Sequence, residues 1–189
     1  MNIQELISGR RTIRKFLQKK IPENLLLSYV ESARLSPSGA NLQPLKYVII
    51  QSKEKVSAVS KHVRWAGYLN GTYTPSKTEQ PTAYIAVMKD NLISTSMAEF
   101  DAGAAIMTIN LRAEADGIGC CIMGAIERES ICQLMNTPDN LSLMYILALG
   151  YKGESPTYVD MHGDDVKYFL TERRITVPKR KISDILTKI

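Results

Sequence analysis

The stretch SMAEFDAGAAIMTINLRAEAD, residues 96–116, is apolar around most of its circumference when it is read as a helix. Such a pattern predicts a helix that is buried in the core or at a contact between subunits. The small residues 102–105 would let another backbone approach closely. Gly117 and Gly119 follow directly, where glycine commonly ends a helix. The sequence therefore predicts one long, buried helix beyond the middle of the chain.

Strands and shorter helices are predicted on both sides of this helix. β-Branched and apolar content indicates strands at residues 45–51, 82–90 and 142–151, with a shorter extended segment at 120–126. Helices are predicted at residues 2–9, 22–35, 52–63 and 127–136. A polar stretch follows up to Arg174, and residues 175–189 suggest a short strand, a basic turn and a tail helix. Because strands and helices do not alternate strictly, we expect an α+β sandwich and not a doubly wound sheet.

Size and composition favour one domain over residues 1–189, since no repeat or linker divides the chain. No uninterrupted apolar run reaches the roughly 20 residues of a membrane helix. The opening MNIQELISGRR lacks the apolar region of a signal peptide. We therefore expect a cytoplasmic protein with no membrane partner.

The cysteines and histidines give no sign of a disulfide or a metal centre. Cys120 and Cys121 are adjacent in an apolar run, and Cys132 makes the count odd, which favours buried thiols in a reducing compartment. His62 and His162 are not at zinc-like spacing from a cysteine or from each other. No metal site is expected.

Positive charge is concentrated at the two ends of the chain. The net charge is +5, but RRTIRK (10–15) and RRITVPKRK (173–181) hold much of the positive charge. Like charges this close repel one another, so each cluster either faces water or holds an anion. A solvated basic edge is the simpler interpretation of one cluster alone. Both clusters could also meet in the fold around a single anion.

Common catalytic motifs are missing from the sequence. GIGCCIMG has the wrong glycine spacing for a dinucleotide fingerprint, and neither a Walker sequence nor a nucleophile elbow is present. Carboxylates are scattered singly, which disfavours a glycosidase. An anion site with little acid–base machinery is typical of a protein in which a bound cofactor does the chemistry. No catalytic side chain is assigned.

Four stretches, in this order and spacing, resemble the nitroreductase family of flavin mononucleotide (FMN) enzymes. They are RRTIRKF (10–16), SPSGANLQP (36–44), GIGCCIMGAI (117–126) and VPKRK (177–181). The resemblance implies a mixed, largely antiparallel central sheet flanked by helices in an intertwined homodimer. It also implies an FMN-dependent oxidoreductase in which NAD(P)H reduces a nitroaromatic, a quinone or a related acceptor by a ping-pong hydride mechanism.

The resemblance assigns roles in the first two stretches. Arg10 and Arg11 would meet the phosphate and ribityl chain of FMN, with the Thr12 hydroxyl beside them. Arg14 would face the N1 and O2 edge of the flavin ring, where a fixed cation favours the reduced form. The residues that would hold FMN from the partner subunit are Pro37, Ser38 and Asn41. Their spacing alone is equally typical of a turn that ends the preceding helix.

The remaining assignments concern the ring and the far end of the chain. The backbone amides of Met123 and Gly124 would face the flavin near N5 and O4. Trp65 and Tyr68 would border the substrate pocket, although a single Trp is more often packed in a core. The second basic arm on the phosphate would be formed by Lys179, Arg180 and Lys181.

Other functions stay open at this point. A flavin-binding storage protein would hold FMN without turnover. A flavin-dependent dehalogenase or dehydrogenase would use the same site for another acceptor or donor. A small nucleic-acid binder would contain no flavin and would lose affinity steeply with salt. Sparse, unpatterned aromatic residues argue against nucleic acid as a partner.

Overall fold

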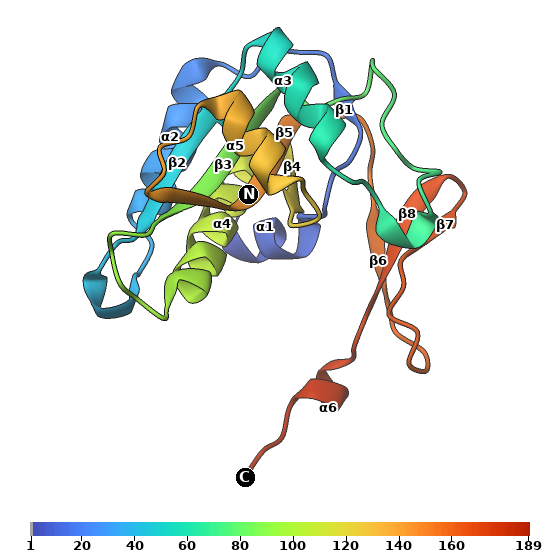
Figure 1. Ribbon diagram of the computed structural model, residues 1–189. Coiled ribbons are helices and arrows are strands. Elements are labelled where there is room, and N and C mark those ends of the chain that lie inside the picture. The colour runs from blue at the N-terminus through green and yellow to red at the C-terminus, as the bar shows by residue number, and fades with distance from the viewer. Residues whose placement is uncertain (1) are drawn as a thin grey trace.

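The computed structural model describes residues 2–189 and has a five-stranded antiparallel sheet at its centre (Figure 1). The order is β1-β5-β3-β2, and β4 also pairs with β5. The strands are β1 (Phe16–Leu17), β2 (Leu45–Ile50), β3 (Ala83–Asp90), β4 (Ile118–Met123) and β5 (Leu141–Lys152). The predicted α+β class with a largely antiparallel sheet is therefore confirmed.

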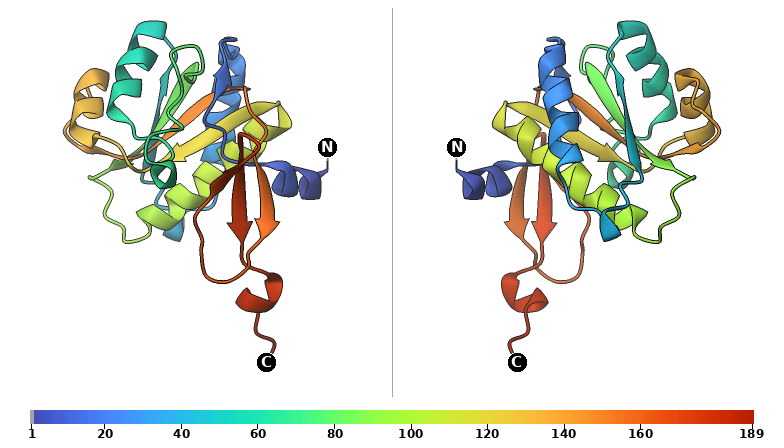
Figure 2. Two further views of the ribbon diagram at one scale, coloured as in Figure 1. Left: turned by 90° about the vertical axis from the view of Figure 1, so that its right-hand side faces the viewer. Right: turned by 90° about the vertical axis from the view of Figure 1, so that its left-hand side faces the viewer.

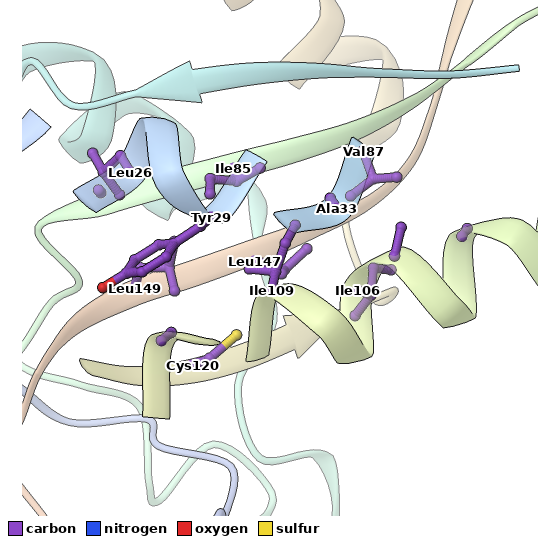
Figure 3. Packing of buried hydrophobic residues seen from close by; sticks show 14 of the residues in the cluster. Leu26, Tyr29, Ala33, Ile85, Val87, Ile106, Ile109, Cys120, Leu147 and Leu149 are labelled. Carbon is purple, nitrogen blue, oxygen red and sulfur yellow. The ribbon is translucent and has the colours of Figure 1, made fainter. Parts of the chain in front are cut away.

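Helices cover both faces of this sheet. They are α1 (Ile3–Gly9), α2 (Glu23–Arg34), α3 (Lys53–Val59), α4 (Ala98–Ala115) and α5 (Arg128–Met135). One core lies between the sheet and the pair α2 and α4, as Figure 3 shows, and a second core lies under α3 and α5. Within residues 2–189, no helix is long and apolar enough to cross a membrane.

The alternation of side chains along β3 divides the two cores. Ile85 and Val87 face α2 and α4, whereas Tyr84, Ala86 and Met88 face α3 and α5, and all five are fully buried. Successive strand residues point to opposite faces, so a strand that is covered on both sides must be apolar throughout. This explains why residues 83–88 form an unbroken apolar run.

A second, three-stranded sheet is built from the C-terminal part of the chain. Its strands are β6 (Thr157–Asp160), β7 (Phe169–Thr171) and β8 (Arg174–Lys179), with β6 parallel and β7 antiparallel to β8. A small cluster of Ala66, Tyr73 and Ile175 joins this sheet to the loop that follows α3. Beyond it, α6 (Ile182–Ile185) and the C-terminus extend away from the body (Figures 1 and 2).

The helix predicted over residues 96–116 is α4, and it is buried on one side only. Ala102, Ile106, Ile109 and Ala113 pack against the sheet. On the outer side Phe100 is 60% exposed. The apolar circumference read from the sequence therefore includes a face that one copy of the chain leaves uncovered.

Candidate functional site

The arginine segment, residues 10–15, leaves α1 and runs beside the start of β4. Thr12 forms a parallel bridge with Cys120, and the Ile13 backbone N–H donates to the Cys120 carbonyl at 3.0 Å. The Ile13 side chain is only 2% exposed. A buried apolar anchor and main-chain hydrogen bonds thus hold the segment, while its basic side chains stay partly exposed.

The arginines of this segment carry positive charge that no acidic side chain neutralises. Within residues 2–189, Arg10, Arg11 and Arg14 form no ion pair within 4.0 Å. Arg11 Nη2 donates to the Ser8 carbonyl at 2.7 Å, at the end of α1. Burial and the neighbouring Arg10 lower the pKa of the Arg11 guanidinium. Arg10 Nε is buried without a hydrogen-bond partner. A buried donor in a positive cluster is suited to an anionic ligand.

The structure brings the arginine segment and the end of β4 together. The parallel bridge at Thr12 directs Arg14 along β4 toward Met123 and Gly124. Met123 is buried and Gly124 is exposed. A Cβ atom at Gly124 would meet the Tyr145 ring at 3.5 Å, an ordinary contact, so packing alone does not require glycine there. The first and third motifs therefore lie in one region.

The proline loop, residues 36–44, is built around a buried carboxylate. Ser38 Oγ donates to Asp101 Oδ2 at 2.6 Å, and the Gly39 backbone N–H donates to Asp101 Oδ1 at 2.9 Å. Ser38 Oγ also accepts from the Gln43 backbone N–H at 2.9 Å. Asp101 is 1% exposed. The motif's second serine is therefore fully engaged in holding the loop.

Several residues of the proline loop have strained backbone conformations. Three that are not glycine have positive φ, namely Ala40, Asn41 and Gln43. Such conformations cost about 1–3 kcal/mol each and gather at functional sites. Pro37 and Asn41 are exposed at the loop surface. The loop is rigidly held and presents these two side chains outward.

The proline loop and the arginine segment lie apart in one chain. The loop packs on the start of α4 through Asp101, and the arginine segment packs on the start of β4, beyond the other end of α4. An 18-residue helix is about 27 Å long. Figures 1 and 2 show the loop, with its short turn at Gly39–Asn41, well away from α1. One copy of the chain does not bring the two motifs together.

The C-terminal basic residues lie at and beyond the end of the sheet that packs against the arginine segment. The Arg11 guanidinium lies 4.3 Å from the ring centroid of Tyr158 on β6. Lys179 ends the neighbouring strand β8, and the exposed basic residues there are Lys179, Arg180 and Lys181. In the described part of the chain no hydrogen bond or ion pair joins them to the arginine segment. Their convergence on one anion stays a prediction.

The two aromatic residues predicted for the substrate pocket differ in position. Trp65 is 7% exposed and packs in the core beneath α3 and α5. Tyr68 is 52% exposed, and its ring centroid lies 5.0 Å from that of Tyr168. The Arg14 guanidinium lies 4.8 Å from the Tyr168 ring. Tyr68 and Tyr168 thus form an aromatic wall next to Arg14.

Tyr168 and Glu154 belong to the site region, and no motif in the sequence singled them out. Both occur in the polar stretch between residues 150 and 174. Glu154 Oε2 accepts from the Tyr73 hydroxyl at 2.5 Å, and burial together with this bond holds the pKa of Tyr73 above its usual value. The pairing of β1 with β5 brings Glu154 to the arginine segment, and the packing of the C-terminal segment brings Tyr168 to it.

Comparison with known proteins gives consistent results. Residues 7–151 match the family model described as Nitroreductase family. A protein of Archaeoglobus fulgidus, named as a candidate NADH dehydrogenase/NAD(P)H nitroreductase, is 27% identical over 162 residues, which cover 82% of this chain and 88% of that relative. The FMN reductase (NADPH) of Bacillus subtilis is 22% identical over 163 residues, 79% of this chain and 66% of its own length.

Solved structures share the fold. A nitroreductase family protein from Clostridium difficile 630 aligns with a TM-score of 0.72 at 21% identity, over 99% of this chain and 98% of that chain. An FMN-dependent nitroreductase from Clostridium difficile R20291 gives 0.69 at 20% identity, over 86% and 99%. The family resemblance read from the motifs is confirmed: the chain belongs to the nitroreductase family.

Proposed function

We propose that this chain is an FMN-dependent oxidoreductase that uses NAD(P)H to reduce a small-molecule acceptor such as a nitroaromatic or a quinone. The observation that carries the proposal is the arginine segment, where Arg10 Nε is buried without a partner. The phosphate of FMN has close to two negative charges, and guanidinium groups bind its oxygens well. These residues fit FMN, and the names of the two flavin-linked relatives support the same cofactor.

Each part of the site has a role in this proposal. Bound FMN would supply hydride transfer from NAD(P)H to the acceptor, which fits a ping-pong order. Arg10 and Arg11 bind the phosphate, with the Thr12 hydroxyl beside the ribityl chain. Arg14 keeps a positive charge at the N1 and O2 edge of the ring, where reduction adds negative charge. The backbone amides of Met123 and Gly124 would face N5 and O4 of the bound flavin. Protons would come from water or from the flavin itself, since no side chain is assigned as an acid.

The acceptor would bind next to the aromatic wall. Tyr68 and Tyr168 offer ring faces close to Arg14, and planar aromatic acceptors stack on such faces. Trp65 precedes Tyr68 in the same loop and would act as its buried support. This arrangement favours quinones and nitroaromatics over aliphatic acceptors.

We further propose that the enzyme is a homodimer in which the proline loop of one copy completes the FMN site of the other, with Pro37 and Asn41 facing the cofactor and Ser38 holding the loop in shape. The separation of the loop from the arginine segment supports this assembly. The C-terminal basic residues 179–181 would add the second arm on the phosphate. A Cβ atom at Gly103 would meet nothing within 4 Å, so another backbone could approach α4 closely. Large apolar side chains exposed on or beside α1, α2 and α4 are Ile3, Ile7, Leu27, Leu35 and Phe100.

The cytoplasm is the proposed location. Cys120, Cys121 and Cys132 are all free thiols in the structure. Free, mostly buried thiols are typical of a reducing compartment.

The cofactor and the activity can be tested on the purified protein. We expect a visible flavin spectrum, FMN in the mass spectrum of the released compound, and oxidation of NADH or NADPH by a quinone far beyond the flavin present. A storage protein would bind FMN without that turnover. Failure to bind FMN after reconstitution would contradict the proposal.

The shared site can be tested by complementation. Co-expression of the Arg10→Ala/Arg14→Ala variant with a Pro37→Ala/Asn41→Ala variant would form mixed dimers that contain one intact site. Random pairing should restore FMN binding at about a quarter of the sites, whereas each variant alone should restore none. No restoration, with mixed dimers present, would mean that each chain builds its site alone.

A further inference from the structure

Glu154 lies where three segments of the chain meet. Its Oε1 accepts hydrogen bonds from the backbone N–H groups of Arg14 and Lys15, the latter at 3.1 Å. Its Oε2 accepts from the hydroxyl of Tyr73, which is buried, at 2.5 Å. One carboxylate therefore joins the arginine segment, the loop after α3 and the turn after β5.

Within the arginine segment, Glu154 contacts the main chain and not the charged side-chain groups of Arg14 and Lys15. The Arg14 guanidinium lies over the Tyr168 ring at 4.8 Å and forms no ion pair with Glu154 in the described residues. The neighbouring Gly153 backbone N–H donates to the Lys15 carbonyl at 2.9 Å. Residues 153–154 thus bind both the backbone N–H and the backbone C=O of Lys15. The guanidinium of Arg14 stays available to a ligand.

We infer that Glu154 is a positioning residue that fixes Arg14 at the flavin-ring end of the site through the backbone of the arginine segment. The inference rests on the proposed function. A binding group contributes fully only when its own supports hold it in the required geometry. Two hydrogen bonds to a carboxylate supply this support, from a residue beyond the 7–151 span of the family match.

The test compares binding of two flavins to apo-protein, measured by quenching of flavin fluorescence. Glu154→Ala should weaken FMN about tenfold, because it removes two hydrogen bonds to a carboxylate and part of their energy supports Arg14. It should weaken riboflavin by the same factor, because Arg14 is assigned to the ring. Arg10→Ala should weaken FMN and leave riboflavin unchanged, because Arg10 is assigned to the phosphate.

Conservative variants separate position from charge. Glu154→Gln keeps an oxygen that accepts from both backbone N–H groups, so it should stay within about threefold of the wild type. Glu154→Asp keeps the charge but withdraws the carboxylate, so it should bind both flavins more weakly than Glu154→Gln. The comparison of Glu154→Gln with Glu154→Asp also tests the inference if Glu154→Ala does not fold.

Glu79→Gln is the matched control. Glu79 Oε1 accepts from Lys15 Nζ at 3.0 Å, beside the same segment, but Glu79 makes no contact with the Arg14 backbone. Its flavin affinities should equal those of the wild type. Tight flavin binding by Glu154→Ala, or stronger binding by Glu154→Asp than by Glu154→Gln, would overturn the inference. A wild-type protein without FMN affinity would instead overturn the proposed function.

Discussion

The arginine segment and the proline loop are each held by one carboxylate, and the two carboxylates are used differently. Glu154 accepts from backbone N–H groups of the segment and leaves the arginine side chains free. Asp101 accepts from a backbone N–H group and also from the Ser38 hydroxyl. The carboxylate of Glu154 therefore leaves the arginine side chains available to a ligand. The carboxylate of Asp101 instead binds the Ser38 side chain, which shapes the backbone of the proline loop.

This difference predicts how the two regions respond to mutation. Arginine side chains without ionic partners contribute little to folding and much to binding of an anion. A buried carboxylate that holds a strained loop contributes mainly to stability. Substitutions in the arginine segment should therefore change FMN affinity, and substitutions around Asp101 should change the free energy of unfolding.

The largest effect is expected for Arg10→Ala combined with Arg14→Ala. Loss of two charged contacts should weaken FMN binding by about 3–6 kcal/mol, since each contributes roughly 1.5–3 kcal/mol. Titration of apo-protein with FMN measures this change. Arg34→Ala is the control, because Arg34 is exposed and, among the described residues, pairs only with Glu31 on the same helix. If the double variant bound FMN with unchanged affinity, the arginine segment would not be part of the FMN site.

The next effect is expected for Asp101→Ala, in the stability of the protein. Asp101 is almost fully buried and accepts two hydrogen bonds, so its loss should lower the free energy of unfolding by about 3 kcal/mol. Urea unfolding measures the change. Glu99→Ala on the same helix is the control, because Glu99 is exposed and, within residues 2–189, its side chain accepts only from the Tyr145 hydroxyl. If both variants lowered the free energy of unfolding equally, Asp101 would not have the proposed role in holding the loop.

A smaller effect is expected when a methyl group is added under each region. A Cβ atom at Gly119 would lie 2.7 Å from Ile13 Cβ, and one at Gly39 would lie 2.7 Å from Met97 Cβ. Overpacking of this kind costs about 1–3 kcal/mol. Gly119→Ala should also weaken FMN binding, because it displaces the arginine segment. Gly9→Ala, with no atom within 4 Å of the new Cβ, should change neither property. A Gly119→Ala variant with wild-type FMN affinity would argue against this coupling.

The sequence predicted the central sheet well because burial on two sides leaves a local signature. The apolar run at 83–88 is explained by the two cores it separates, and the helix at 98–115 by its packing on the sheet. Strands β6 and β7 were not predicted, because most of their residues are exposed and show no periodic pattern. Both strands pair with β8, and Ile175 of β8 packs against Ala66 and Tyr73, which are distant in sequence.

The sequence predicted the motifs of the candidate site but not the residues that hold these motifs in place. The basic side chains of 10–15 and the loop at 36–44 are short-range patterns that a sequence displays directly. Glu154 contacts Arg14 across 140 positions, and Asp101 contacts Ser38 across 63. Single carboxylates at such separations have no local signal, so only the fold reveals them.

The smallest effect, and the sharpest test of the difference between the two regions, is expected for Ser38→Ala. It removes one donor to Asp101 and the acceptor of the exposed Gln43 N–H group, which water can replace, so stability should fall by about 1 kcal/mol. Ser38→Thr keeps the hydroxyl and should unfold at nearly the wild-type urea concentration. The Ser38 hydroxyl is already used in hydrogen bonds within the loop. Ser38→Ala should therefore change FMN affinity only slightly, through a small loss of order in the loop. A large loss of FMN affinity at unchanged stability would show that Ser38 binds the ligand directly, as we propose for the arginines.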